Sequence, residues 1–266
     1  MKHIFSKSNR ALLAELVRTD FKLRYQGSAL GYAWSLLRPL FMFGILFIVF
    51  NFIFKVGKGI PNYPIYLFVG IVLWNFFNEM TSQSLGSIVA RGSLIRKVRI
   101  PRWMIIVSTS VAALINVSLN LIIVLVLSVA SGLDFMPTSI YFPLFVLEVY
   151  LFALGVSLIL APLFVKYRDI TYIWDVLTQA GFYATPILYP LTLVKQEIIQ
   201  KLMFINPMAQ AIQGAREIYV TKETLTIGEV YGTPWAVLIP LSVVIVVLVS
   251  GVLYFKKQAP KFAEEL

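Results

Sequence analysis

Long apolar segments alternate with short polar segments along most of the 266 residues. A helix needs roughly 20 mostly apolar residues to cross the hydrocarbon core of a bilayer. We therefore expect six membrane-spanning helices, at about residues 32–54, 63–89, 104–130, 141–165, 170–189 and 235–255. Two of them are less uniform, because the second becomes polar after Trp74 and the fifth meets Pro186 and Pro190, which should break it. The pattern predicts an all-α integral membrane protein with a single transmembrane domain.

The segment before the first span has an amphipathic pattern over about residues 8–24. Leu12, Leu13 and Leu16 fall on one side, and charged residues fall elsewhere. This pattern favours a helix that lies in the cytoplasmic interface of the membrane. A plain solvated helix is the alternative.

The segment between the second and third spans, residues 90–103, is strongly basic and carries no acidic residue. An anchoring loop would need only the charges, but apolar residues alternate with them here. We therefore predict a short helix at about 92–100 that packs against a cytoplasmic partner, with Pro101 at its end.

The segment between the fifth and sixth spans is too long for a simple connection. Two short helical patterns, at about 195–205 and 208–220, are separated by Asn206-Pro207, which stops one helix and starts the next. Neither pattern has enough apolar residues to cross a bilayer. We expect short re-entrant helices in the outer leaflet, and an ordinary extracellular loop is the alternative.

The distribution of Lys and Arg predicts the orientation. With the N-terminus inside, most of the 23 basic residues fall in cytoplasmic segments, as the positive-inside rule requires. We therefore expect a multi-pass protein of the inner (plasma) membrane with both termini in the cytoplasm. This topology accounts for the net charge of +10, so nucleic acid is not expected as a partner.

The composition excludes several kinds of chemistry. Hydrophobic residues make up 59% of the chain and charged residues 14%, against about 25% charged in a soluble domain. The chain has no cysteine and one histidine, His3, so we expect no disulfide, no metal site and no catalytic residue. It also lacks a phosphate-binding loop, so any ATP hydrolysis must come from a separate subunit.

Polar side chains inside the spans are the candidate functional residues, because such groups are costly in a membrane. They recur at helical spacing in the second and fifth spans. We predict a translocation path lined by Trp74, Asn75, Asn78, Glu79, Asp175 and Gln179. Hydrogen bonding that only holds the helices together is the alternative for both spans. Glu148 stands alone in the fourth span, which favours a packing role.

Several segments carry a resemblance to a known family. Leu23–Leu40, LRYQGSALGYAWSLLRPL, closely resembles the start of the first span in type-2 ABC exporter permeases for lipid-linked polysaccharides. These permeases export O-antigen, teichoic acid or capsular chains. Further matches follow in the same order, at FVGIVLWNFF, SLIRKVRIPRW, FVKYRDI, YATPILYP and FINPMAQAI.

The resemblance implies a permease homodimer with two ABC ATPase subunits, which bind ATP and Mg while this chain binds no cofactor. It implies that the basic segment is the coupling helix, with Leu94, Ile95, Arg96, Lys97, Val98 and Arg99 as its contact residues. It also implies an outer gate that includes Tyr183, Pro186, Asn206 and Pro207.

A lipid-linked substrate would enter from the inner leaflet, where cations could hold its diphosphate. The candidate residues are Arg18, Lys22, Arg24 and Arg38. Topology and attraction to anionic lipids could explain these charges equally well. The leading function is export of a lipid-linked polysaccharide, and the alternative is a type-2 permease for a small hydrophobic drug or lipid. A membrane enzyme acting on lipid-linked sugars would need a carboxylate pair, but Glu79, Glu148 and Asp175 lie on separate spans.

Overall fold

The computed structural model describes residues 7–25, 30–57, 59–97 and 101–265, and within these ranges the chain is helical with no strand. The α-helices are α1 (Lys7–Tyr25), α2 (Trp34–Phe47), α3 (Tyr63–Ala90), α4 (Gly92–Lys97), α5 (Trp103–Ala130), α6 (Phe142–Lys166), α7 (Ile170–Ala184), α8 (Glu197–Ile205), α9 (Pro207–Tyr219), α10 (Ile227–Tyr231), α11 (Leu238–Gln258) and α12 (Phe262–Glu265). A π-helical turn, Ile48–Ile53, continues α2. Short 3-10 helices lie at Gly31–Ala33, Pro137–Tyr141, Leu191–Leu193, Pro234–Val237 and Ala259–Lys261.

Four helical segments are long and apolar enough to cross a membrane. They are Trp34–Ile53, Trp103–Ala130, Pro137–Lys166 and Pro234–Lys261, and each coincides with a predicted span. The chain is therefore a multi-pass membrane protein. The predicted spans at 63–89 and 170–189 correspond to α3 and α7, which fall outside this group, so six crossings stay a prediction.

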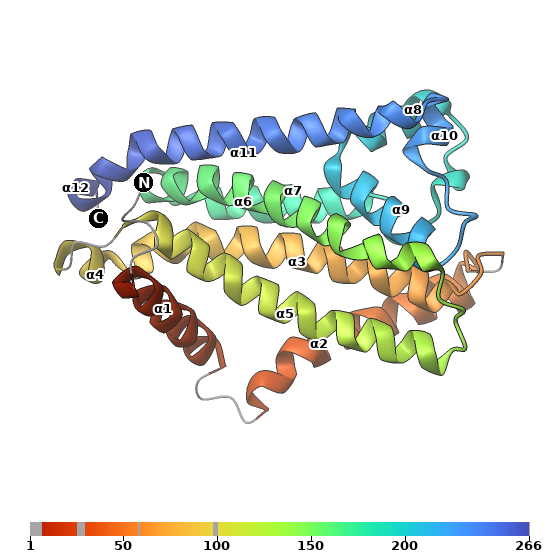
Figure 1. Cartoon of the computed structure of the whole chain (residues 1–266), viewed down its shortest axis with the longest axis horizontal. Helices are drawn as coiled ribbons and strands as arrows, with labels where there is room; N and C mark the ends of the chain where they lie inside the picture. Colours follow the sequence, from red (N-terminus) through yellow and green to blue (C-terminus); the bar gives the residue numbers. More distant parts are fainter. Residues whose placement is uncertain (1–6, 26–29, 58, 98–100, 266) are drawn as a thin grey trace.

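Helix α3 is the centre of the bundle. It lies between α5 and α6, and α6 in turn packs against α11 (Figure 1). Leu67, Phe68 and Val69 on successive sides of α3 are all completely buried. A helix that is apolar all round is stable only when protein or lipid surrounds it, and here protein does so.

Glycines allow α6 and α11 to approach closely. A Cβ atom added to Gly155 of α6 would lie 2.8 Å from the backbone of Leu248 in α11, and one added to Gly251 of α11 would meet the carbonyl oxygen of Gly155. Small residues at such crossings bring helix backbones together, which increases van der Waals contact in membrane bundles.

The two ends of the bundle differ. Helices α1, α4 and α12 lie at one end, and α8, α9 and α10 lie at the other (Figure 1). Helix α4 covers only the first part of the predicted segment at 92–100, since residues 98–100 lie outside the described ranges. Helix α7 ends at Ala184, five residues before the predicted end of its span, because Pro186 forces the preceding Thr185 into an extended conformation.

Candidate functional site

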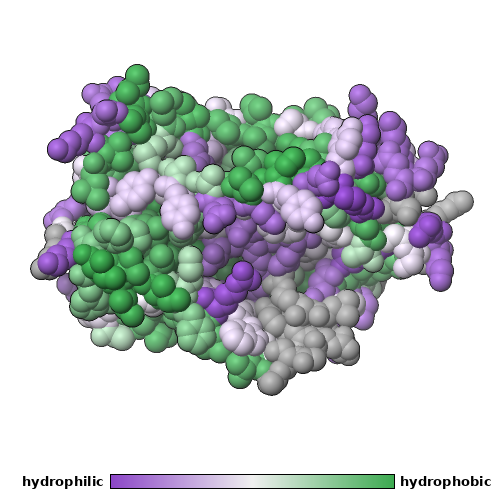
Figure 2. All heavy atoms as spheres, turned by 180° about the vertical axis from the view of Figure 1, so that it is seen from behind, coloured by the Kyte–Doolittle hydropathy of each residue, from purple (hydrophilic) through white to green (hydrophobic). Residues whose placement is uncertain are grey.

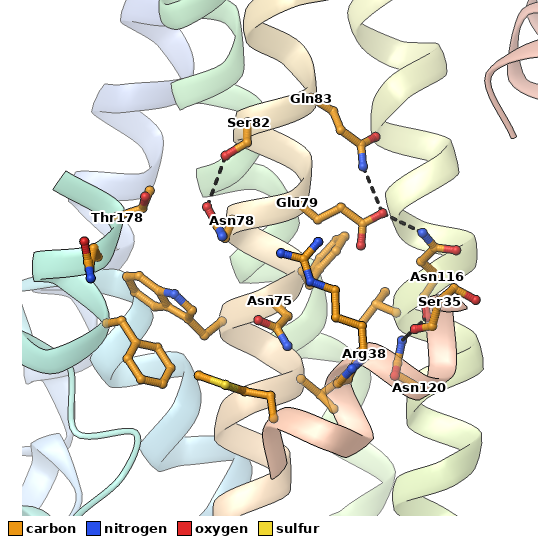
Figure 3. Close-up of a pocket in the computed structure, with 18 of the residues that line it drawn as sticks. Ser35, Arg38, Asn75, Asn78, Glu79, Ser82, Gln83, Asn116, Asn120 and Thr178 are labelled. Carbon is orange, nitrogen blue, oxygen red and sulfur yellow. Dashed lines mark hydrogen bonds between the residues drawn. The ribbon is translucent and has the colours of Figure 1, made fainter. Parts of the chain in front are cut away.

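A cavity of about 1040 Å³ opens between α2, α3, α5 and α7. Figure 2 shows one face of the molecule, where hydrophilic side chains fill a hollow between apolar surfaces. The polar side chains of the cavity lining are Ser35, Arg38, Asn75, Asn78, Glu79, Ser82, Gln83, Asn116, Asn120, Asp175, Thr178 and Gln179. Helix α3 contributes five of these twelve residues, more than any other helix, and Figure 3 shows how ten of the twelve converge from several helices.

The polar stripe of α3 follows from helical spacing. Asn75, Asn78, Glu79 and Ser82 recur at intervals of three and four residues, which places them on one face of the helix. All four are partly buried and line the cavity. Within the stripe, the Ser82 hydroxyl donates a hydrogen bond to Asn78 Oδ1 at 3.1 Å.

The carboxylate of Glu79 links α3 to α5. Its Oε1 atom accepts hydrogen bonds from Asn116 Nδ2 at 2.5 Å and from Gln83 Nε2 at 3.1 Å (Figure 3). Amide donors satisfy part of the hydrogen-bonding capacity of a carboxylate inside a membrane protein, which lowers the cost of placing it there.

Asn120 forms one hydrogen bond within α5 and one to α2. Its Nδ2 atom donates to the backbone oxygen of Asn116 at 2.8 Å and to that of Ser35 at 3.4 Å. The Oδ1 atoms of Asn116 and Asn120 have no hydrogen-bond partner among the residues that the structure describes. Both oxygen atoms are buried inside the protein.

Aromatic side chains form the wall between α3 and α7. The rings of Trp74 and Phe182 meet edge to face, with their centroids 6.0 Å apart. A Cβ atom at Gly181 would lie 2.9 Å from Trp74 Cη2, so the absence of a side chain there lets the indole pack on α7. Trp174 Nε1 also donates to Thr81 Oγ1 at 3.2 Å and ties α7 to α3.

All six residues of the predicted path line this one cavity. They are Trp74, Asn75, Asn78 and Glu79 from α3, and Asp175 and Gln179 from α7. Glu79 and Asp175 thus share a site although they lie on separate helices. Glu148 is elsewhere, buried on α6, and within the described part of the chain its Oε1 atom has no hydrogen-bond partner.

Of the four predicted head-group cations, the structure describes the side chains of Arg38 and Arg18, and these two lie apart. Arg38 lines the cavity, while Arg18 is exposed on α1 and is not part of the lining. Lys22 and Arg24 belong to α1, but their side chains lie outside what the structure describes.

The predicted outer-gate residues join the end of α7 to the start of α9. Asn206 Nδ2 donates to Thr185 Oγ1 at 3.2 Å, and Asn206 Oδ1 accepts from the backbone N–H of Met208 at 3.0 Å, which caps α9. Pro207 is the first residue of α9, where its fixed φ suits a helix start. Tyr183 is separate from this group and lines the cavity.

Arg216 completes this region, and the sequence pattern did not single it out. Its side chain is fully buried, and its guanidinium carbon lies 3.6 Å from the centre of the Tyr66 ring. It donates to the backbone oxygens of Tyr66, Pro186 and Ile187 at 2.6–2.9 Å, and to Gln213 Oε1 at 3.0 Å. One side chain therefore holds α3, α9 and the broken end of α7 together.

The predicted coupling residues divide between two sides of α4. Ile95 is buried and packs with Ile88 and Phe262, whereas Arg96 and Lys97 are exposed and Leu94 is partly exposed. Val98 and Arg99 lie outside the described residues.

Helix α1 is fastened to the start of α4. Asp20 forms an ion pair with Arg91, which lies between α3 and α4, and it accepts a hydrogen bond from the Ser108 hydroxyl at 3.0 Å. Leu16 of α1 is buried at the contact with α5. These contacts would therefore transmit a displacement of α4 to α1.

The sequence analysis missed the α5 side of the cavity. Asn116 and Asn120 are two carboxamides spaced i, i+4 in an otherwise apolar span, and this spacing is the signal that could have identified them. Over the described ranges, no group of three or more His, Cys, Asp or Glu residues could hold a metal ion.

Comparison with known proteins gives one family. The family described as "ABC-2 type transporter" matches residues 11–220. The O-antigen export system permease protein RfbA of Myxococcus xanthus is 33% identical over 97% of this chain and 96% of its own length. A protein of the same name from Klebsiella pneumoniae is 28% identical over 96% of the chain and 95% of its own length. The polysialic acid transport protein KpsM of Escherichia coli is 22% identical over 74% of the chain and 77% of its own length.

Proposed function

Because the chain belongs to the ABC-2 type transporter family, we propose that it is the membrane-spanning permease subunit of an ATP-driven exporter that moves a lipid-linked polysaccharide out of the cytoplasm. The observation that carries this proposal is the 33% identity to an O-antigen export permease over nearly the whole of both chains. The polar cavity supports it, since hydroxyl-rich cargo needs polar partners within the bilayer.

The proposed topology has six crossings of the inner membrane, with both termini in the cytoplasm. α3 and α7 supply the two crossings beyond the four apolar segments. Their polar stripes face the cavity, which explains why they are less apolar than the others. Basic residues gather around α4 and at the end of α11, in keeping with a cytoplasmic location for that end of the bundle.

Helix α4 is the proposed contact with the ATPase, which binds ATP and Mg. Its exposed Arg96 and Lys97, with Leu94 beside them, form the surface that a partner can reach, while buried Ile95 fastens α4 to its own chain. Movement of the ATPase would then reach α1 through Asp20 and Arg91.

A second copy of the chain is the proposed cover for the open side of the cavity. α2 and α7 flank the cavity, and both expose large apolar side chains such as Ile45 and Val176. A two-fold symmetric dimer that pairs these faces would enclose a path between two cavities. Arg38 stands at this open side and is the cation that supports a role in holding the lipid diphosphate, with Arg18, Lys22 and Arg24 as further candidates on α1.

Transport by the purified complex tests the proposed function. The chain and its cognate ATPase are reconstituted in liposomes that carry a lipid-linked neutral glycan, and glycan exposed on the far side is quantified with a lectin. We expect exposure that depends on ATP and disappears with a hydrolysis-deficient ATPase. Stimulation of ATP hydrolysis by hydrophobic drugs or simple lipids, with none by the glycan, would establish the alternative permease function instead.

A further inference from the structure

Helix α4 is too short to keep its conformation by itself. It has six residues, whereas an isolated helix shorter than about 12 residues is marginal in water. Contacts with the rest of the chain must therefore hold it in one orientation. Ile95 makes such a contact, because it is buried in an apolar cluster that also contains Ile88 of α3. The direction in which the exposed Arg96 and Lys97 point therefore depends on how firmly Ile95 is held.

Helix α12 packs against α4, although the two helices lie far apart in the sequence. Its first residue, Phe262, is 0% exposed and belongs to the same apolar cluster as Ile95. The Phe262 ring also meets the ring of Phe255 in α11 edge to face, with the two centroids 5.7 Å apart. Aromatic pairs prefer this arrangement. Phe262 therefore joins α4 to the end of α11, at the end of the bundle where α4 and α12 both lie (Figure 1).

A second contact lies on the other side of the basic segment. Arg102, which directly precedes α5, donates a hydrogen bond from Nη1 to the backbone oxygen of Ala259. Ala259 begins the 3-10 turn Ala259–Lys261, which connects α11 to α12. A hydrogen bond from a guanidinium is stronger than one between two neutral groups. The turn and α12 together therefore hold the basic segment at two places, at Ile95 within α4 and at Arg102 after it.

The contacts of Phe262 lie inside the chain. The apolar cluster that encloses its ring combines residues of α3, α4, α5, α6 and α11. By contrast, Arg96 and Lys97 of α4 and Glu264 and Glu265 of α12 are exposed. Phe262 is therefore placed to orient α4 and not to meet a partner protein itself. Removing its ring would loosen α4 but would leave the exposed side chains of α4 chemically unchanged.

We propose that Phe262 is a positioning residue that holds α4 in its docking orientation before the ATPase binds. This inference rests on the proposed function, in which α4 is the contact with the ATPase. When α4 is already ordered, docking loses little conformational entropy, so the affinity is higher than it would be for a mobile α4. The hydrogen bond from Arg102 to Ala259 supports Phe262 by fixing the turn that leads into α12.

The first test measures the affinity of the ATPase for the full chain in nanodiscs. Phe262→Ala should raise the Kd about threefold to tenfold, the effect expected when docking must also order a loosened segment. ATP hydrolysis at saturating ATPase should stay near the wild-type rate, because the exposed side chains of α4 are unchanged. Phe262→Leu should restore most of the affinity, since leucine keeps an apolar side chain of similar size in the cluster.

Phe204→Ala is the matched control for a general loss of stability. Phe204 is 1% exposed and lies in a separate apolar cluster on α8, at the opposite end of the bundle (Figure 1). Its truncation should lower the melting temperature but leave the Kd for the ATPase unchanged. An unchanged Kd in Phe262→Ala, or an equal rise in Phe204→Ala, would overturn the positioning role alone. A wild-type chain that binds no ATPase would overturn the proposed function as well.

The second test observes α4 before the ATPase is added. The chain has no cysteine, so a nitroxide on Ser93→Cys reports the mobility of α4 alone in an electron paramagnetic resonance spectrum. We expect a more mobile spectrum when Phe262→Ala is added and no change when Phe204→Ala is added. If Phe262→Ala does not assemble, Arg102→Met carries this test, because it removes the donor to Ala259. An unchanged spectrum in the variant used would contradict the proposal.

Discussion

Helices α2 and α3 are both apolar, but they differ in burial: α3 is enclosed by other helices of the chain, whereas α2 is largely exposed. Leu67 and Phe68 of α3 are completely buried by the surrounding helices. By contrast, only 6% of the apolar window of α2 and its extension is buried within the chain, and Ile45 and Phe52 are more than 60% exposed. Apolar character alone does not tell whether a helix will meet its own chain, lipid or a second copy.

The difference lies in how each helix can pack. α3 has glycine-assisted and aromatic contacts on several sides, including Gly70, where a Cβ atom would collide with Arg216. α2 contacts α3 along one side only, through pairs such as Phe43 and Phe68 with ring centroids 5.0 Å apart. The region around α3 is therefore closely packed within the chain, whereas α2 is a largely exposed side of the cavity.

The largest effect is expected at Arg216. Arg216→Ala would leave three backbone oxygens and Gln213 without their donor in the buried region around α3. We expect a loss of stability of about 3–5 kcal/mol, seen as a lower melting temperature or failed expression in detergent. Arg216→Lys should recover only part of the loss, because an ammonium cannot reproduce the planar guanidinium contacts. Wild-type stability of Arg216→Ala would show that the region around α3 is not held by this residue.

Two glycine substitutions, one in the closely packed bundle and one in the exposed helix α2, compare the two regions directly. Gly155→Ala places a methyl group against the α11 backbone, so we expect destabilisation of about 1–3 kcal/mol. Gly44→Ala in α2 is the matched control, since a Cβ atom there meets nothing within 4 Å among the described residues, and a helical Gly→Ala change should be neutral or slightly stabilising. Similar melting temperatures for the two variants would remove the contrast between the regions.

Cross-linking tests whether a second copy of the chain covers the exposed apolar side chains of α2 and α7. The chain has no cysteine, so Ile45→Cys with Val176→Cys introduces the only thiols, on the two helices that flank the cavity. We expect covalent dimers with an oxidant, with melting temperatures near the wild-type value. Val246→Cys on α11 is the control, because Val246 is equally exposed but lies on the far side of α6. Dimers from Val246→Cys alone would place the second copy elsewhere.

The smallest effect is expected where α1 meets α4. Asp20→Asn removes the ion pair with Arg91 but leaves the polar shape. A partly exposed pair contributes little, so the melting temperature should report a loss below about 1 kcal/mol. The ATP hydrolysis stimulated by glycan should fall more clearly, since α1 would no longer follow α4. Full stimulation in Asp20→Asn would exclude this pair from coupling.

Helix positions and the polar stripes could be predicted from the sequence because they depend on local periodicity. Asn75, Asn78 and Glu79 recur at helical spacing, and their cost in a membrane marks them as a shared face. Their partner Asn116 could not be paired with them, because the contact joins residues 37 positions apart and depends on how α3 and α5 cross.

The contacts of Arg216, which also join residues far apart in the sequence, were even harder to predict. In the sequence it is one basic residue in a polar outer segment, close to Glu217. Its burial arises only when the chain breaks at Pro186 and again at Asn206, which bring carbonyl oxygens around one guanidinium. The position of a helix break can be predicted from the local sequence. The side chain that will donate hydrogen bonds to the carbonyl oxygens exposed by the break cannot be predicted in this way.

Labelling at Ser93 tests the central claim most directly, namely that the end bearing α4 faces the cytoplasm and receives the ATPase. Ser93 is exposed on α4, so Ser93→Cys gives a single reactive thiol without disturbing the buried Ile95 side. We expect a membrane-impermeant maleimide to label this thiol only after the inner membrane is opened, and bound ATPase to protect it. Labelling from outside intact cells would contradict the account.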